Sequence, residues 1–199
     1  MLKNGWKLIP LCLLMIILWG HWHIHQTRGA GTSVISTSFL TYEERCLGPV
    51  GEITRCRELE GLLEVGDILV TASAHTLFFR HGHAGAVVDT EKGLVLEVLG
   101  LGEVSAFLPL NRWEYFPTLM ILRPNPPFRG DIKKEAQKLS GLSYFPFASR
   151  DSQGWVQCAT LIWRLFDNLG VGLDMEGLIL PLRLAESPNL SLVYSDGFN

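Results

Sequence analysis

The segment from Trp155 to Gly170 constrains the fold most, because it predicts an amphipathic helix with Cys158 in its first turn. Gly170 is well suited to ending this helix. Apolar residues recur at intervals of three and four, at Leu161, Ile162, Leu165, Phe166 and Leu169. The unpaired N–H groups and the positive dipole of a helix N-terminus favour a thiolate, which makes Cys158 a candidate nucleophile. The alternative is a small buried hydrophobe at the start of a helix.

The N-terminal residues 1–25 have the pattern of an export signal. Lys3 and Lys7 precede an uncharged run from Leu8 to Ile24. We expect an uncleaved signal anchor that binds the membrane, because no good small-residue cleavage site follows; a cleaved signal peptide is the alternative. The lysines predict a cytoplasmic N-terminus. The domain is therefore expected in the cell envelope, on the periplasmic side of the inner membrane, or secreted if the signal is cleaved.

The rest of the chain has the length and composition of one globular domain. Residues 26–40 are rich in Gly, Ser and Thr and predict a linker, which leaves 41–199 for the domain. The sequence is 47% hydrophobic, so it can build a core, and its net charge is -3. This charge argues against a nucleic-acid partner, since such a protein needs a basic surface.

The cysteines outside the signal also bear on function. Cys46 and Cys56 flank a short loop with two glycines and a proline, and in an exported protein they can form a disulfide. Cys158 would then remain unpaired, which strengthens its candidacy as a nucleophile. The alternative is that all three thiols are reduced and buried.

A hairpin in the middle of the domain supplies a candidate base. Three apolar runs bounded by turn residues predict strands at 67–73, 83–90 and 94–100. His83 and Glu97 fall opposite or nearly opposite each other on the second and third strands, and on the same face. A carboxylate beside an imidazole fixes its tautomer and favours its protonated form, which stabilises a thiolate. We expect Gly85 to leave open space there for a nucleophile or substrate.

Glu97 stands alone among aliphatic residues, so its burial requires a partner. His83 and Arg112 are the candidates for that partner. His75 and His81 compete with His83 for the role of base. His81 is expected in a loop, and both are weighed against a surface or structural role.

Four short motifs occur together in a recognisable order. They are Val65-Gly66-Asp67-Ile68-Leu69-Val70, His83-Ala84-Gly85-Ala86-Val87-Val88, Leu96-Glu97-Val98 and Val156-Gln157-Cys158-Ala159-Thr160-Leu161. This pattern, over about residues 63–194, resembles the circularly permuted papain-like branch of the NlpC superfamily of cysteine hydrolases, and within it the YiiX-like group. In that branch the histidine strand precedes the cysteine helix.

The resemblance implies an α+β, permuted papain-like fold in which an antiparallel sheet packs against the helix that carries the cysteine. It implies Cys158 as the nucleophile, His83 as the base and Glu97 as the orienting residue. Ala159-Thr160 departs from the Ser-Glu of many relatives, so a role of that glutamate does not carry over. Further strands are predicted at 105–110, 115–123 and 190–194, and a helix at 131–139.

The expected activity is that of an exported thiol amidase or peptidase that cleaves an amide bond in cell-wall peptide and needs no metal or cofactor. Candidates for a second oxyanion donor or for substrate binding are Tyr144, Gln153, Gln157 and Trp155. The alternatives are a lipid amidase or acyltransferase, and a non-catalytic module that binds a wall or lipid ligand. The sequence leaves the scissile bond and the oligomeric state open.

Overall fold

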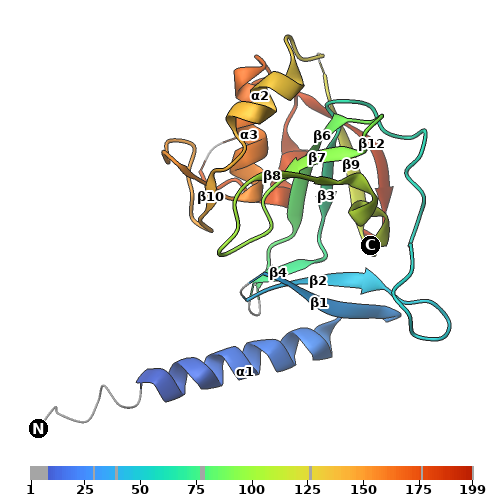
Figure 1. The fold of residues 1–199 in the computed structure, drawn as a ribbon, viewed down its shortest axis with the longest axis vertical. Coiled ribbons are helices and arrows are strands. Elements are labelled where there is room, and N and C mark those ends of the chain that lie inside the picture. Colours follow the sequence, from blue (N-terminus) through green and yellow to red (C-terminus); the bar gives the residue numbers. More distant parts are fainter. Residues whose placement is uncertain are drawn as a thin grey trace, which may run out of the picture.

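The computed structural model describes residues 9–28, 30–38, 40–76, 79–125, 127–175 and 177–198 of the 199-residue chain. The fold is α+β, with antiparallel sheets and a few helices (Figure 1). The coarse fold class expected from the sequence is therefore confirmed.

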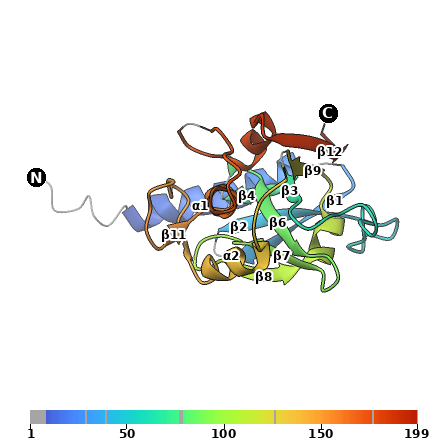
Figure 2. The same ribbon diagram turned by 90° about the horizontal axis from the view of Figure 1, so that it is seen from above.

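A six-stranded antiparallel sheet forms the centre of the domain. Its strands, in spatial order, are β12 (Leu190–Asp196), β9 (Leu119–Pro124), β3 (Ile68–Thr71), β6 (His83–Asp89), β7 (Leu94–Glu97) and β8 (Ala106–Pro109). Figure 2 shows this order from β12 to β8. Every residue of β6 is buried, because both faces of the sheet are covered. The strands predicted at 67–73, 83–90 and 94–100 are all present, each somewhat shorter.

Two different layers cover the sheet. On one face lie α3 (Cys158–Asn168) and the short α2 (Ile132–Lys138), and the apolar stripe of α3 packs against β6 (Figure 1). The opposite face packs against the 3-10 helix η2 (Leu110–Tyr115), whose Trp113 is fully buried. The predicted strand at 115–123 begins later than expected because this 3-10 turn precedes β9.

A second, four-stranded sheet lies beside the first. It contains β1 (Thr32–Ser38), β2 (Thr41–Cys46), β4 (Ala74–Thr76) and β5 (Phe79–Arg80). The prediction of a linker at 26–40 is therefore wrong over most of its length. The hydroxyl and β-branched residues of β1 pair with β2, so a composition typical of linkers serves as a strand here. Short β10 (Ser143–Tyr144), β11 (Trp155–Val156) and the 3-10 helix η3 (Pro181–Glu186) complete the domain.

Disulfide pairing follows the sequence expectation. Cys46 and Cys56 are joined, with an S–S distance of 2.04 Å, and Cys158 is free and buried. The bridge ties the end of β2 to the segment that precedes β3. Cys12 is also free, and exposed.

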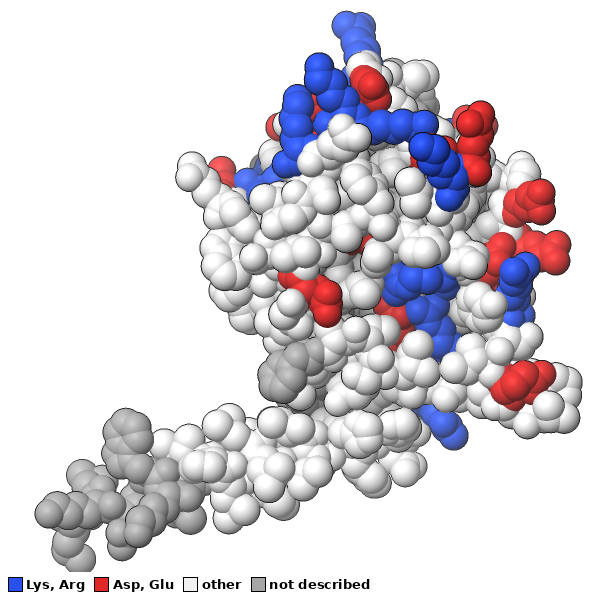
Figure 3. Space-filling view, viewed as in Figure 1, with Lys and Arg blue, Asp and Glu red and all other residues white. Residues whose placement is uncertain are grey.

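The helix α1 (Ile9–Thr27) corrects the prediction of a membrane anchor. It projects from the domain as an arm without charged side chains, and its last turns contact the body through the buried Ile24 (Figures 1 and 3). Among the described residues, no helix is both long enough and apolar enough to span a membrane. The predicted transmembrane helix is therefore wrong: polar and histidine residues occupy the last two turns of α1, which leaves its apolar part too short. Lys3 and Lys7 of the predicted signal lie outside the described residues.

Candidate active site

Cys158 occupies the first position of α3, as the sequence predicts. Gln157 is the N-cap, and its side-chain Oε1 accepts a hydrogen bond from the Ala159 N–H at 2.8 Å. Thr160 completes a capping box, because its Oγ1 accepts from the Gln157 N–H at 3.0 Å. Cys158 is 3% exposed, and its thiol lies where the helix dipole favours a negative charge. The sulfur lies 3.6 Å from Gln157 Oε1.

His83 and Glu97 are hydrogen-bonded in a fully buried pair. The imidazole Nε2 and the carboxylate Oε2 are 2.6 Å apart, and both side chains are 3% exposed or less. The register pairs Ala86 with Leu96, so the two residues are diagonal neighbours rather than directly opposite. Because Nε2 is bound to Glu97, Nδ1 is the ring nitrogen left for the Cys158 side chain, which is close enough to raise the pKa of His83.

This environment favours the protonated form of the imidazole. Burial lowers the pKa of His83, but the hydrogen bonds with Cys158 and Glu97 and the charges of both partners outweigh burial and raise the pKa to about 10. For Glu97 the effect of burial has the opposite sign and raises the pKa. His83 and Arg112 outweigh burial and hold this pKa below its usual value. At neutral pH the site therefore holds a carboxylate beside an imidazolium, and an imidazolium is the partner that a cysteine nucleophile requires.

Glu97 has a second partner in Arg112, so both of its expected partners are present. Arg112 Nη1 donates to Glu97 Oε1 at 2.7 Å, while Nη2 donates to Glu43 Oε1 at 3.1 Å. Arg45 donates to the other oxygen of Glu43, and also to the Arg112 carbonyl at 2.6 Å. Strand β2 of the second sheet thus braces the carboxylate that orients His83. No pattern in the sequence indicated Glu43 or Arg45.

The space beside Gly85 is filled, so the expectation of an open approach there is wrong. A Cβ at this position would lie 2.6 Å from Val95 Cγ1 and 2.9 Å from Trp113 Cζ2. The Trp113 ring stacks on the His83 ring with centroids 5.4 Å apart. Glycine is therefore needed for the approach of the tryptophan, whose ring packs on the imidazole.

A hollow of about 540 Å³ opens beside Cys158. Its walls are mostly apolar and include Phe79, Pro146, Phe147, Leu178, Leu180 and Pro181. Tyr144, Gln157 and Thr76 add polar groups, and Arg80 and His81 contribute nitrogen-bearing side chains. A pocket of this size accommodates a small-molecule or acyl group.

The four residues considered for oxyanion or substrate binding separate into two groups. Tyr144 and Gln157 line the hollow, whereas Gln153 and Trp155 are exposed and are not among its lining residues. Burial, together with the charge of a Cys158 thiolate, raises the pKa of Tyr144 in spite of a hydrogen bond with Thr76. Its hydroxyl therefore stays protonated and can donate. The Gln157 amide is already used by Ala159 and by the carbonyl of Ile179.

The competing histidines have other partners. His81 is hydrogen-bonded through Nε2 to Thr76 Oγ1 at 2.7 Å and through Nδ1 to the Gly82 carbonyl at 2.5 Å. Burial lowers the pKa of His81 to about 4, so its ring is neutral at physiological pH. His75 Nε2 lies 2.7 Å from Glu44 Oε1 in the second sheet. Neither residue has the cysteine and carboxylate together.

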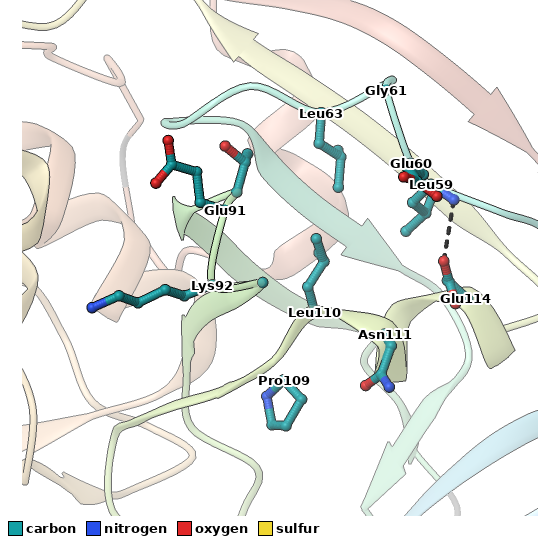
Figure 4. A pocket seen from close by; sticks show the side chains of 12 residues that line it. Leu59, Glu60, Gly61, Leu63, Glu91, Lys92, Pro109, Leu110, Asn111 and Glu114 are labelled. Carbon is teal, nitrogen blue, oxygen red and sulfur yellow. Dashed lines mark hydrogen bonds between the residues drawn. The ribbon is translucent and has the colours of Figure 1, made fainter.

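A second hollow, of about 460 Å³, lies elsewhere on the molecule. Figure 4 shows Leu63 and Leu110 pointing toward each other across it, with Glu114 accepting a hydrogen bond from the Leu59 N–H at 3.3 Å. The described residues that line this hollow include neither cysteine nor histidine. The hollow beside Cys158 is therefore the better candidate for chemistry.

Comparison with known proteins adds no relative: no family model, no curated protein and no solved structure matches the chain.

Proposed function

We propose that the protein is a thiol hydrolase that cleaves an amide bond through Cys158, His83 and Glu97. The observation that carries this proposal is the buried bond of 2.6 Å between His83 Nε2 and Glu97 Oε2, with the other side of the imidazole turned to a cysteine at a helix N-terminus. A nucleophile, a base and an orienting carboxylate in contact are the requirements of covalent acyl transfer.

The reaction has two steps. The Cys158 thiolate attacks the acyl carbon, and the His83 imidazolium gives its proton to the leaving amine as the C–N bond breaks and a thioester forms. Water then attacks the thioester and passes a proton to His83 as the C–S bond breaks, which releases the carboxylic acid and restores the Cys158 thiolate beside the His83 imidazolium. The Cys158 N–H at the N-terminus of α3 and the Tyr144 hydroxyl are the proposed donors to the oxyanion.

We infer a permuted papain-like arrangement for the fold. The antiparallel sheet packs against α3, and the histidine strand β6 precedes this helix in the chain. The location of the domain outside the cytoplasm is likewise a proposal, supported by the disulfide between Cys46 and Cys56.

The substrate is proposed to be an acyl amide, either in cell-wall peptide or in a lipid. The mostly apolar walls of the hollow favour an acyl group or side chain that is itself apolar. The apolar walls therefore support two alternatives to the peptidase. One is a lipid amidase, and the other is an acyltransferase that uses another acceptor in place of water.

The test is to incubate the full-length protein with cell-wall peptide fragments and with lipid amides, and to detect new amines and acids by mass spectrometry. We expect release by the wild type and a covalent acyl adduct of the size of the substrate's acyl group. Cys158→Ser should show neither. Ligand binding without turnover or adduct by the wild type would instead indicate a non-catalytic binding module.

A further inference from the structure

A second buried carboxylate lies behind the rim of the same hollow. Glu44 Oε1 accepts hydrogen bonds from His75 Nε2 and from Arg80 Nη2, each at 2.7 Å. The three residues come from β2, β4 and β5, where the register pairs His75 with Arg80 and places β4 beside β2. The sheet thus holds one side of the Arg80 guanidinium in a defined place.

The three side chains of this cluster differ in solvent exposure. The side chain of Glu44 is 1% exposed and that of His75 is 5% exposed, whereas that of Arg80 is 49% exposed. The negative charge therefore lies inside the protein and the positive charge faces solvent. Because a guanidinium has five N–H donors in a planar fork, the contact with Glu44 leaves Arg80 with donors for a ligand.

Arg80 lines the hollow that contains Cys158. None of the described residues that line this hollow is acidic, and His81 is neutral at physiological pH. Among the described lining residues other than Cys158, Arg80 is therefore the one that presents a formal charge to a substrate. Apolar walls beside a fixed cation match a ligand with an apolar acyl part and an anionic group.

We propose that Arg80 is a specificity-determining residue that binds an anionic group, a carboxylate or a phosphate, on the substrate of this hydrolase. Glu44 and His75 are positioning residues that hold the guanidinium at the rim. This inference rests on the proposed function, since it names a feature of the substrate cleaved at Cys158. The two sources of such an anion are a free amino-acid carboxylate and a phosphate headgroup.

The experiment compares matched amides with the full-length protein. The probes are N-dodecanoylglycine, its neutral counterpart N-dodecanoylglycinamide, and N-dodecanoyl phosphoethanolamine. We expect kcat/KM of the wild type to be about tenfold higher for an anionic probe than for the neutral one, mainly through KM, as one charge-assisted contact predicts. A preference for glycine indicates a carboxylate source, a preference for phosphoethanolamine indicates a phosphate source, and either supports the proposal.

Variants distinguish the loss of anion recognition from a general loss of activity. Arg80→Gln should bring the ratio of kcat/KM for anionic and neutral probes close to one, and Glu44→Gln should lower it by a smaller factor. Arg129→Gln is the matched control, because Arg129 is exposed and does not line the hollow, and it should keep the wild-type ratio. Restoration of part of the ratio by Arg80→Lys would show that the charge itself contributes.

A binding measurement keeps this inference distinct from the proposed function. Calorimetry on Cys158→Ser should show tighter binding of an anionic probe than of the neutral one, and Arg80→Gln in that background should remove the difference. Equal affinities would overturn the anion site whatever the turnover. Discrimination in binding without any turnover by the wild type would overturn the hydrolase and retain the anion site.

Discussion

Glu97 and Glu44 are two buried carboxylates with the same types of partner and different surroundings. Each accepts hydrogen bonds from one histidine and one arginine, at 2.6 to 2.7 Å. The histidine of Glu97 also meets Cys158, whereas the arginine of Glu44 reaches the rim of the hollow. The same three residue types thus prepare a proposed base in one sheet and a proposed anion contact in the other.

The comparison teaches that a histidine, a carboxylate and an arginine do not by themselves make an active site. The pair at Glu97 acquires its proposed chemistry because the N-terminus of α3 brings a thiol to the free side of His83. The cluster at Glu44 has no thiol among the contacts described for it, and its cation is turned outward. Substitutions matched between the two clusters test this difference.

The largest effect is expected at the cysteine. Cys158→Ser should lower kcat at least about a thousandfold, because serine is a far poorer nucleophile without a stronger base. Rates of amide cleavage measured with excess enzyme detect this loss. Cys12→Ser is the control, since Cys12 is the other free cysteine and is exposed, and it should keep wild-type kcat. Equal losses in both variants would contradict the assignment.

The two histidines should differ almost as much. His83→Gln should lower kcat about a thousandfold through loss of the base, whereas His75→Gln should act mainly on KM for an anionic probe. Iodoacetamide labelling of Cys158 at pH 7, followed by mass spectrometry, should also be slower in His83→Gln, since the imidazolium that stabilises the thiolate is gone. Thermal unfolding curves check that both variants fold. Similar kcat losses in the two would remove the distinction.

The pH dependence of activity should differ between substitutions at Glu97 and at Glu44. Glu97→Gln should lower kcat by roughly a hundredfold. Because His83 has a pKa raised to about 10, activity of the wild type should fall as pH rises through that value and the imidazolium is lost. Removal of the carboxylate lowers this pKa, so the alkaline limb of the Glu97→Gln profile should move to lower pH. Glu44→Gln should leave the limb where it is; a shift in both variants would mean that the limb does not report on His83.

The smallest effect is expected at the arginine that braces Glu97. Arg112→Lys keeps the charge but cannot bridge Glu97 and Glu43 with two separate nitrogens, so we expect about a tenfold loss of kcat. Steady-state kinetics measure it, and Arg112→Gln should lose more. Arg129→Lys, at an exposed position, is the control. An unchanged kcat in Arg112→Lys would show that Glu97 needs no second support.

Much of the candidate site could be predicted from local patterns. The period of the apolar residues placed Cys158 at a helix start, and the hairpin brought His83 near Glu97 over a separation of 14 residues. Isolation of Glu97 among aliphatic residues pointed to both of its partners. The register agrees with the expected near-opposite placement: Ala86 pairs with Leu96, which makes His83 and Glu97 diagonal neighbours, and the bulge lies nearer the turn, between Val87 and Asp89.

Two predictions failed where distant segments meet, and a third failed for a local reason. The composition of β1 resembles a linker, and only its pairing with β2 makes it a strand. Gly85 suggested open space, but the ring of Trp113 from η2 fills it. The apolar run near the N-terminus suggested a membrane span, whereas α1 is too short in its apolar part.

The sequence by itself determined the helix start at Cys158 and the hairpin that carries His83 and Glu97, because helical and strand periods and caps are properties of neighbouring residues. Tertiary structure decided which charges meet: Arg112 reaches Glu43 across 69 positions, and Arg80 reaches Glu44 across 36. The first contact depends on how η2 lies against the second sheet and the second contact on the strand order within that sheet, and a buried carboxylate takes whichever cation this arrangement supplies.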